Sequence, residues 1–320
     1  RYFLDSVCNR IAEVDKGKLY SYDTNYAGYL ELKAQREEMA QATELKRQNI
    51  LRTELAWVQR GARARSTKQK ARLERYEELK NRKAPETDGQ VELGSISTRL
   101  GRTTLEARHV EKGYGDRILI HDFSYIFLKN DRVAFIGANG CGKTTLMKLL
   151  TGKEQPDSGE IIVGQTVKIG YYAQEVTHMD PNMRVIDYVR EVAEFVPTTE
   201  GSVSAAKMLE RFLFEGSEQY TEIGRLSGGE KRRLNLLRVL MGAPNVLILD
   251  EPTNDLDITT LTVLEDYLDH FEGIVIIVSH DRYFLDRTVS RIFAFEEGGH
   301  LQQYEGNYSD YALRKSMETQ

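Results

Sequence analysis

One stretch decides the fold class: RVAFIGANGCGKTTLMKLL, which runs from Arg132 to Leu150. Its first five residues form an apolar run of strand length, and residues 137–144 satisfy the pattern G-x-x-x-x-G-K-[ST] before a leucine-rich helical segment. The glycines let consecutive backbone N–H groups curl around an anion at a helix N-terminus. Strand, phosphate-binding loop and helix in this order, with further strand-like runs downstream, predict an α/β domain with a mostly parallel core sheet.

The loop residues are expected to share the work of holding a nucleotide. Lys143 is predicted to reach the β and γ phosphates of ATP, and the hydroxyl of Thr144 to bind Mg²⁺. Cys141 occupies a variable position of the motif and is interpreted as a small packed side chain. The residues of this loop predicted to contact ATP are Gly137, Asn139, Gly140, Cys141, Gly142, Lys143, Thr144 and Thr145.

A second apolar run ends in two carboxylates. Residues 246–249 read Val-Leu-Ile-Leu and are followed by Asp250 and Glu251. The carboxyl end of such a strand lies beside the phosphates in a doubly wound sheet. Asp250 is therefore predicted to hold Mg²⁺, directly or through water, and Glu251 to act as general base on the attacking water.

A third motif, Leu-Ser-Gly-Gly-Glu at residues 226–230, indicates the family. With the two motifs above, it makes residues 103–320 resemble an ATP-binding cassette. This resemblance implies three further site residues. Gln174 in Tyr-Tyr-Ala-Gln belongs to the catalytic and metal centre, His280 in Val-Ser-His-Asp is the switch histidine, and Tyr114 is similar to the aromatic residue that stacks on adenine.

The 226–230 motif is itself a glycine-containing loop at a helix N-terminus. Ser227, Gly228 and Gly229 are therefore expected to attract a γ-phosphate. In the cassette family this motif serves the nucleotide that the opposite cassette holds. A working site thus needs two cassettes arranged head to tail.

An internal repeat predicts where the second cassette comes from. The sequence Arg-Tyr-Phe-Leu-Asp at residues 1–5 recurs at residues 282–286, and residues 25–33 match residues 307–315 at four positions. Residues 1–34 are therefore expected to be the C-terminal remnant of an earlier cassette, with roughly 179 of its residues missing upstream. The predicted partner is that N-terminal cassette of the same chain.

Residues 35–102 join the two copies and are predicted to form a charged helical linker. Apolar residues recur at spacings of three and four, which favours two helices folded into an antiparallel hairpin. Residues 56–73 contain six basic residues and no acidic one. These cations predict contact with nucleic-acid phosphates at the tip of the hairpin, although a solvated coiled-coil surface is the other interpretation. They are Arg60, Arg63, Arg65, Lys68, Lys70 and Arg72.

The combination of tandem cassettes, a Glu at the end of the third motif and a charged linker resembles the ABC-F family. Residues 54–68 resemble its Uup branch. Membership would imply an ATPase that uses ATP and Mg²⁺ and engages the ribosome, with the linker near tRNA and rRNA. Two other classes stay open: a DNA-associated ATPase, because cations alone do not distinguish the two nucleic acids, and the energy subunit of a membrane transporter.

Composition narrows the class further. The chain has 320 residues, of which 40% are hydrophobic and 29% charged, as expected for a well-cored globular protein. Its two cysteines have no metal-ligand spacing and fit a reducing compartment. The longest apolar runs are shorter than the ~18 residues that a membrane helix needs. We therefore expect a cytoplasmic protein without a membrane partner.

Overall fold

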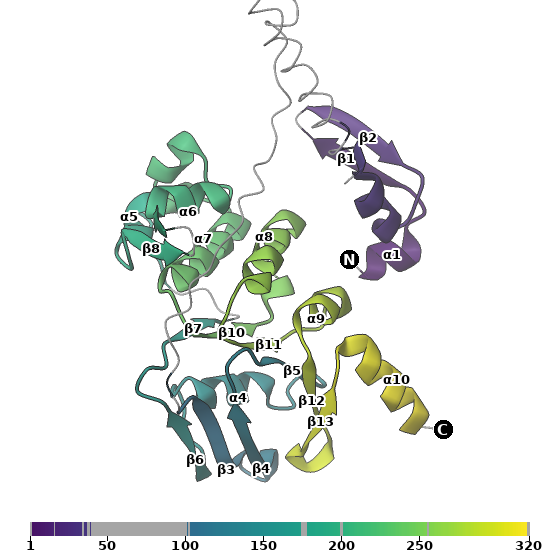
Figure 1. Ribbon diagram of the computed structural model, residues 1–320, viewed down its shortest axis with the longest axis vertical. Coiled ribbons are helices and arrows are strands. Elements are labelled where there is room, and N and C mark those ends of the chain that lie inside the picture. The colour runs from purple at the N-terminus through teal and green to yellow at the C-terminus, as the bar shows by residue number, and fades with distance from the viewer. Residues whose placement is uncertain are drawn as a thin grey trace, which may run out of the picture. The chain divides into compact units, whose positions relative to one another are not determined.

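The chain divides into two compact units, Arg1–Gln90 and Val91–Gln320 (Figure 1). The computed structural model describes residues 2–15, 17–33, 35–36, 39, 101, 103–173, 178–198, 201–254 and 256–318. The linker predicted at residues 35–102 therefore lies almost wholly outside the described residues.

The first unit is a helix followed by a β-hairpin and a second helix. Its elements are α1 (Tyr2–Val7), β1 (Ile11–Asp15), β2 (Lys18–Tyr22) and a helical segment at residues 26–33. β1 and β2 pair in antiparallel fashion, and Gly17 between them has φ 75°, a conformation that glycine adopts without steric cost.

The second unit ends with the same order of elements, so the sequence repeat is also a structural repeat. These elements are α9 (Arg282–Thr288), β12 (Arg291–Phe295), β13 (Leu301–Glu305) and α10 (Tyr308–Glu318). The two copies share a hydrogen bond from a helix amide to an aspartate: Ala27 N donates to Asp5 Oδ1 at 2.9 Å, and Ser309 N donates to Asp286 Oδ1 at 2.7 Å. Equivalent residues thus make this contact in both copies.

A six-stranded sheet forms the centre of the second unit. Its order is β13-β12-β5-β11-β10-β7, and all neighbouring pairs are parallel except β12 with β13. The strands not yet given bounds are β5 (Arg132–Ile136), β7 (Ile169–Tyr172), β10 (Val246–Asp250) and β11 (Ile274–Val278). The predicted α/β fold with a mostly parallel core sheet is confirmed.

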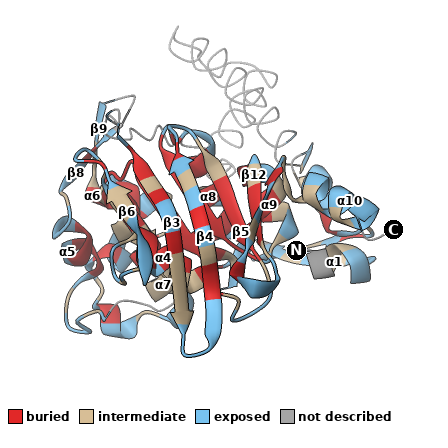
Figure 2. Cartoon of the chain, turned by 90° about the horizontal axis from the view of Figure 1, so that it is seen from below, coloured by how far each residue is buried: buried red, intermediate tan, exposed pale blue. Residues whose placement is uncertain are grey.

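Each central strand divides its side chains between two hydrophobic cores, because successive residues of a strand point to opposite faces. In β10, Val246 and Ile248 pack in one core, whereas Leu247 and Leu249 pack in the other. Burying one such side chain contributes on the order of 2 kcal/mol. The continuous apolar runs of the sequence are therefore strands that are buried on both faces. Figure 2 colours each residue by burial, and β5 is among the strands that are mostly buried.

The core that contains Val246 and Ile248 lies between the central sheet, one helix and a three-stranded antiparallel sheet of order β4-β3-β6. These elements are α4 (Lys143–Leu150), β3 (Leu105–Tyr114), β4 (Arg117–Phe127) and β6 (Ser158–Val163). Helices cover the other face: α5 (Val185–Arg190), α6 (Ala205–Arg211), α7 (Gly228–Met241), α8 (Ile258–Asp269) and α9.

Shorter elements complete the unit. They are the hairpin β8 (Phe195–Thr198) and β9 (Gly201–Ser204), and the 3-10 turns η1 (Gly216–Tyr220), η2 (Ile223–Arg225), η3 (Pro252–Asn254) and η4 (Glu297–Gly299). Among the described residues, no helix combines the length and apolarity needed to cross a membrane.

Candidate nucleotide-binding site

The carboxyl ends of β5, β10 and β11 open into a cavity of about 570 Å³. The loop between β5 and α4 forms one wall, and it turns sharply at Gly142, which has φ 119°. A Cβ at this position would lie 3.1 Å from the carbonyl oxygen of Leu119, so both conformation and space favour glycine there. Lys143 Nζ donates to the carbonyl oxygens of Gly137 and Ala138 at 2.8 and 3.0 Å. The loop thus holds the ammonium group of Lys143 next to its own backbone N–H groups, which are suited to bind an anion.

Asp250 offers a buried carboxylate oxygen to this cavity. The residue has no exposed surface, and burial raises its pKa, an effect that the Thr144 and Tyr171 hydroxyls and Lys143 oppose. The Tyr171 hydroxyl donates to Oδ2 at 3.3 Å, while Oδ1 makes no hydrogen bond to the described residues. A buried oxygen without a partner requires an explanation, and a hard divalent cation supplies one.

The donor set around Asp250 fits Mg²⁺ in particular. No group of three or more His, Cys, Asp or Glu side chains able to hold a metal occurs in the described part of the chain. Mg²⁺ is usually bound by one or two protein oxygens together with phosphates and water, and not by a closed protein cage. Oδ1 of Asp250 and the Thr144 hydroxyl would be those protein ligands.

Glu251 and His280 face each other across the ends of β10 and β11. Oε1 of Glu251 lies 3.3 Å from Nε2 of His280, and the glutamate side chain is 8% exposed against 51% for the histidine. Burial raises the pKa of Glu251, while the charges of His280 and Lys143 oppose the rise. Glu251 also has φ 51°, a left-handed backbone conformation that is strained for a residue other than glycine.

The 226–230 motif begins α7 and lies outside the lining of this cavity. Ser227 caps the helix: its Oγ accepts from Glu230 N at 3.3 Å, and its own N–H donates to Glu230 Oε2 at 2.7 Å. Gly228 and Gly229 are exposed, and a Cβ on either would meet no atom within 4 Å. The start of this helix is therefore accessible to another molecule.

Tyr114 lies at the end of β3, close to the phosphate-binding loop. Its ring is 53% exposed, its hydroxyl donates to Glu154, and Lys112 Nζ lies 5.6 Å from the ring centroid. The hydrogen bond to Glu154 raises the pKa of the Tyr114 hydroxyl, with Thr145 acting in the opposite direction. An accessible ring beside α4 fits the stacking role predicted for it.

Comparison with known proteins agrees with this geometry. A family profile described as "ABC transporter" matches residues 120–254, and a second profile of the same description matches residues 12–93. The second unit has the fold of an ATP-binding cassette. The cassette's fold resembles a solved "ATP binding subunit of ABC transporter" with a TM-score of 0.56 at 18% identity, covering 67% of this chain and 94% of that one. It also resembles the cassette MJ0796, described as a dimer bound to ADP and Pi, with a TM-score of 0.51 at 19% identity, covering 63% and 98%.

The relatives in sequence extend beyond the cassette. The chain is 54% identical over 312 residues to the "Uncharacterized ABC transporter ATP-binding protein YfmR" of Bacillus subtilis, covering 97% of this chain and 50% of the relative. It is 43% identical over 324 residues to the "Energy-dependent translational throttle protein EttA" of Mycobacterium tuberculosis, covering 98% and 58%. The EttA of Escherichia coli K12 is 40% identical, with 97% and 56% covered. The chain therefore spans little more than half the length of these relatives.

The predicted site residues fall into three groups. The cassette brings nine of them together in the cavity lining: Asn139, Gly140, Gly142, Lys143, Thr144, Thr145, Asp250, Glu251 and His280. Gly137, Cys141, Tyr114, Ser227, Gly228 and Gly229 lie outside that lining. Gln174 and the six linker cations Arg60, Arg63, Arg65, Lys68, Lys70 and Arg72 lie outside the described residues, so their roles stay predictions.

Two placements refine the sequence interpretation of the loop. The Cys141 sulfur lies 2.8 Å from the position that a Cβ on Gly137 would take, so the cysteine fills the space which that glycine leaves open. Arg117 was not predicted, yet its guanidinium donates to the carbonyl oxygen of Gly140 at 2.9 Å. Arg117 pairs with Tyr114 at the end of the β3–β4 hairpin. The hairpin therefore contacts the loop through the side chain of Arg117. No motif marks such a contact between an arginine and a backbone carbonyl.

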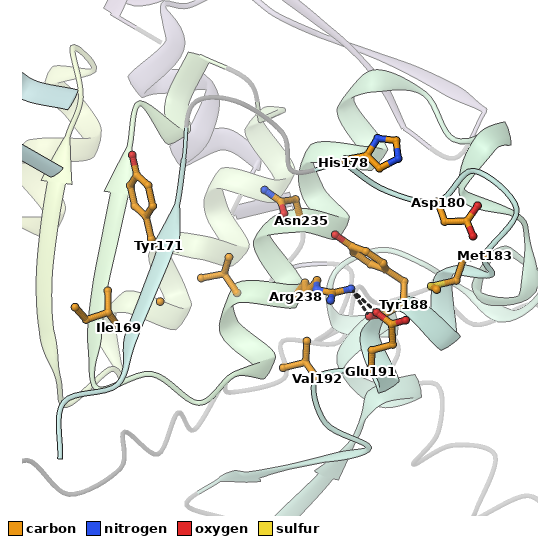
Figure 3. A pocket seen from close by; sticks show the side chains of 12 residues that line it. Ile169, Tyr171, His178, Asp180, Met183, Tyr188, Glu191, Val192, Asn235 and Arg238 are labelled. Atoms are coloured by element: carbon orange, nitrogen blue, oxygen red, sulfur yellow. Dashed lines mark hydrogen bonds and ion pairs between the residues drawn. The ribbon is translucent and has the colours of Figure 1, made fainter. Parts of the chain in front are cut away.

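A second cavity of about 510 Å³ lies beside β7 and α7 (Figure 3). Its cation Arg238 is already engaged, since it donates to Glu191 Oε2 and to the carbonyl oxygen of Tyr188, both at 3.0 Å. Neither the glycine loop nor Lys143 reaches this cavity. The glycine loop and Lys143 therefore belong to the first cavity and not to this one.

Proposed function

We propose that this chain is the C-terminal part of an ABC-F ATPase that hydrolyses ATP between tandem cassettes and acts on the ribosome. The observation that carries the enzymatic part is the pair Glu251 and His280, 3.3 Å apart in the cavity that also contains Lys143. A buried carboxylate beside an imidazole at a phosphate-binding loop is suited to move a proton from water.

The cassette's own residues supply one half of the site that phosphoryl transfer requires. Lys143 and the amides of the loop hold the β and γ phosphates, and the accessible ring of Tyr114 holds the base. Mg²⁺, held by Thr144 and Asp250, would neutralise charge on the phosphates. Glu251 accepts the proton of the attacking water, and its raised pKa brings it closer to the working pH, as general-base catalysis favours.

The tandem arrangement is supported by the first unit. β12 lies between β5 and β13, and Phe293 at its centre is 3% exposed. Its counterpart β1 pairs with β2 alone among the described strands, and Ala12, the residue equivalent to Phe293, is exposed. The edge and face of β1 would be covered by the strands of an upstream cassette, as β12 is covered by its own.

The action on the ribosome rests on relatives and on composition. Two of the relatives reported above carry the name "Energy-dependent translational throttle protein EttA", and residues 56–73 hold six cations without an acid. A linker hairpin with this charge would contact tRNA and rRNA phosphates in the cytoplasm. The Uup branch rests on residues 54–68, outside the described residues, and stays a prediction. The profile described as "ABC transporter" and the transporter subunit at 18% identity indicate the cassette fold, which by itself does not favour a transporter. No observation on the described residues favours the DNA-associated alternative.

Ribosome binding provides the test. The complete tandem protein carrying Glu251→Gln is incubated with ATP and sedimented with ribosomes, and its affinity for duplex DNA is measured at the same salt concentration. We expect ATP-dependent co-sedimentation and weaker binding to DNA. Tighter binding to DNA than to ribosomes would favour the DNA-associated ATPase instead.

A further inference from the structure

We propose that the hydroxyl pair of Thr253 and Ser279 is a latch that positions His280 against Glu251. The proposal rests on the proposed ATPase function and assigns two positioning residues that no motif singled out. Thr253 Oγ1 and Ser279 Oγ lie 2.9 Å apart, a normal hydrogen-bond distance between hydroxyls. Neither side chain lines the nucleotide cavity, so the latch acts through the residues beside it.

The latch joins the two segments that carry the catalytic pair. Thr253 lies in η3, two residues after Glu251, and Ser279 lies between the end of β11 and His280. A second bond runs parallel to it, since Glu251 N donates to the carbonyl oxygen of Val278 at 2.8 Å. The ends of β10 and β11 are therefore clamped at two points, one through backbone and one through side chains.

The backbone on both sides of His280 is held in place. Ser279 is 2% exposed, and its Oγ also accepts from Asp281 N at 3.0 Å. Asp281 in turn caps α9, because its Oδ1 accepts from Phe284 N at 3.2 Å. His280 is thus a half-exposed side chain on a backbone that is fixed by the latch before it and by the helix cap after it.

The exposure of the His280 side chain explains why a latch is needed. Few neighbours restrict the His280 ring, which is 51% exposed, so its distance from Glu251 depends on where the backbone places it. A misplacement of about 1 Å can cost about 10²-fold in rate when a catalytic geometry is lost. The hydroxyl pair fixes the relative position of the two segments. It leaves no unsatisfied buried hydroxyl at Ser279, because the two hydroxyls form a hydrogen bond with each other.

The test replaces Thr253 by its isostere. In the complete tandem protein, Thr253→Val should lower kcat roughly tenfold or more and leave the Kd for ATP unchanged, because the phosphate loop is untouched. Thr253→Ser keeps the hydroxyl and should restore kcat. Thr262→Val is the matched control, since Thr262 donates to the carbonyl oxygen of Ile258 on the exposed side of α8, away from the cavity.

A double-mutant comparison shows whether the latch acts through His280. In a His280→Ala background, Thr253→Val should cause no further loss of kcat. An equal loss in both backgrounds would overturn the proposal, as would an equal loss in kcat and ATP affinity accompanied by a lower Tm.

A readout that does not need turnover separates this proposal from the ATPase function. With labelled histidine in the 320-residue chain, the NMR signal of His280 should shift in Thr253→Val and keep its position in Thr253→Ser and Thr262→Val. An unchanged His280 signal in Thr253→Val would refute the latch even if the enzyme is active. Absence of turnover in the wild-type tandem protein, with the His280 shift present, would instead refute the ATPase function alone.

Discussion

Ser227 and Glu230 cap each other at the start of α7, each accepting the backbone N–H of the other. This capping box explains locally why a glutamate ends the 226–230 motif: its carboxylate closes the first turn of the helix. Both side chains are thus engaged in folding, while the glycines between them are left exposed.

The capping box predicts an acid-dependent loss of stability. The hydrogen bond from the Ser227 amide lowers the pKa of Glu230 below its ordinary 4.5. The contribution of this carboxylate is therefore complete above pH 4.5 and is lost as the pH falls through the lowered pKa. In urea unfolding between pH 7 and 3, the decrease in stability should be smaller in Glu230→Gln than in the wild type, whereas Glu194→Gln, at an exposed carboxylate, should behave like the wild type. Ser227→Ala should cost about 1 kcal/mol at pH 7.

The isolated 320-residue chain should bind Mg-ATP and hydrolyse it slowly. The cavity and Lys143 are complete within one cassette, but the 226–230 motif of a partner is missing from it. Turnover should rise with protein concentration if two copies pair, and ATPase rates measured over a hundredfold range of concentration will show it. A high rate that is independent of concentration would contradict the shared-site proposal.

Glu251→Gln keeps the shape of the side chain and removes the base. In the complete tandem protein, we expect hydrolysis to fall by roughly 10²-fold or more while ATP binding is retained. Single-turnover hydrolysis and equilibrium binding of a labelled ATP measure the two quantities separately. Wild-type turnover in this variant would assign the base to another group.

The linker should act on nucleic acid without affecting the ATP site. Replacing Arg60, Arg63, Arg65 and Lys68 by alanine should weaken binding to ribosomes and to structured RNA at low salt. The slope of log affinity against log salt should become shallower by roughly 3 units if all four residues contact phosphates. Nucleotide affinity serves as the internal control. An unchanged slope with a loss of helicity would show that these cations form a solvated structural face.

The sequence predicted those parts of the fold that depend on local pattern. Residues 132–136 and 246–249 were predicted as strands; the first run coincides with β5 and the second lies within β10, because strands buried on both faces appear as uninterrupted apolar runs. The glycine loop could also be predicted from the sequence, since its backbone geometry restricts the residue type at Gly142.

Contacts that depend on the relative placement of distant segments could not be predicted. The hydrogen bond from Tyr171 to Asp250 joins residues on neighbouring parallel strands far apart in the sequence. The contact from Arg117 to Gly140 depends on where the β3–β4 hairpin ends, and this hairpin contains register shifts with positive φ angles at His109 and Asp122. No periodicity in the sequence marks such irregularities.

The parallel order of the central strands also determines when the site appears during synthesis. β5 pairs with β11, which is formed from a segment more than one hundred residues further along the chain. Such non-local pairing is slow, and domains fold as units once their segments have been made. The loop around Lys143 therefore leaves the ribosome well before Glu251 and His280 have been synthesised. Nucleotide binding can be measured on nascent chains of increasing length. We expect it to begin abruptly after β11 has emerged, at the length at which the hydrophobic core of the cassette can form.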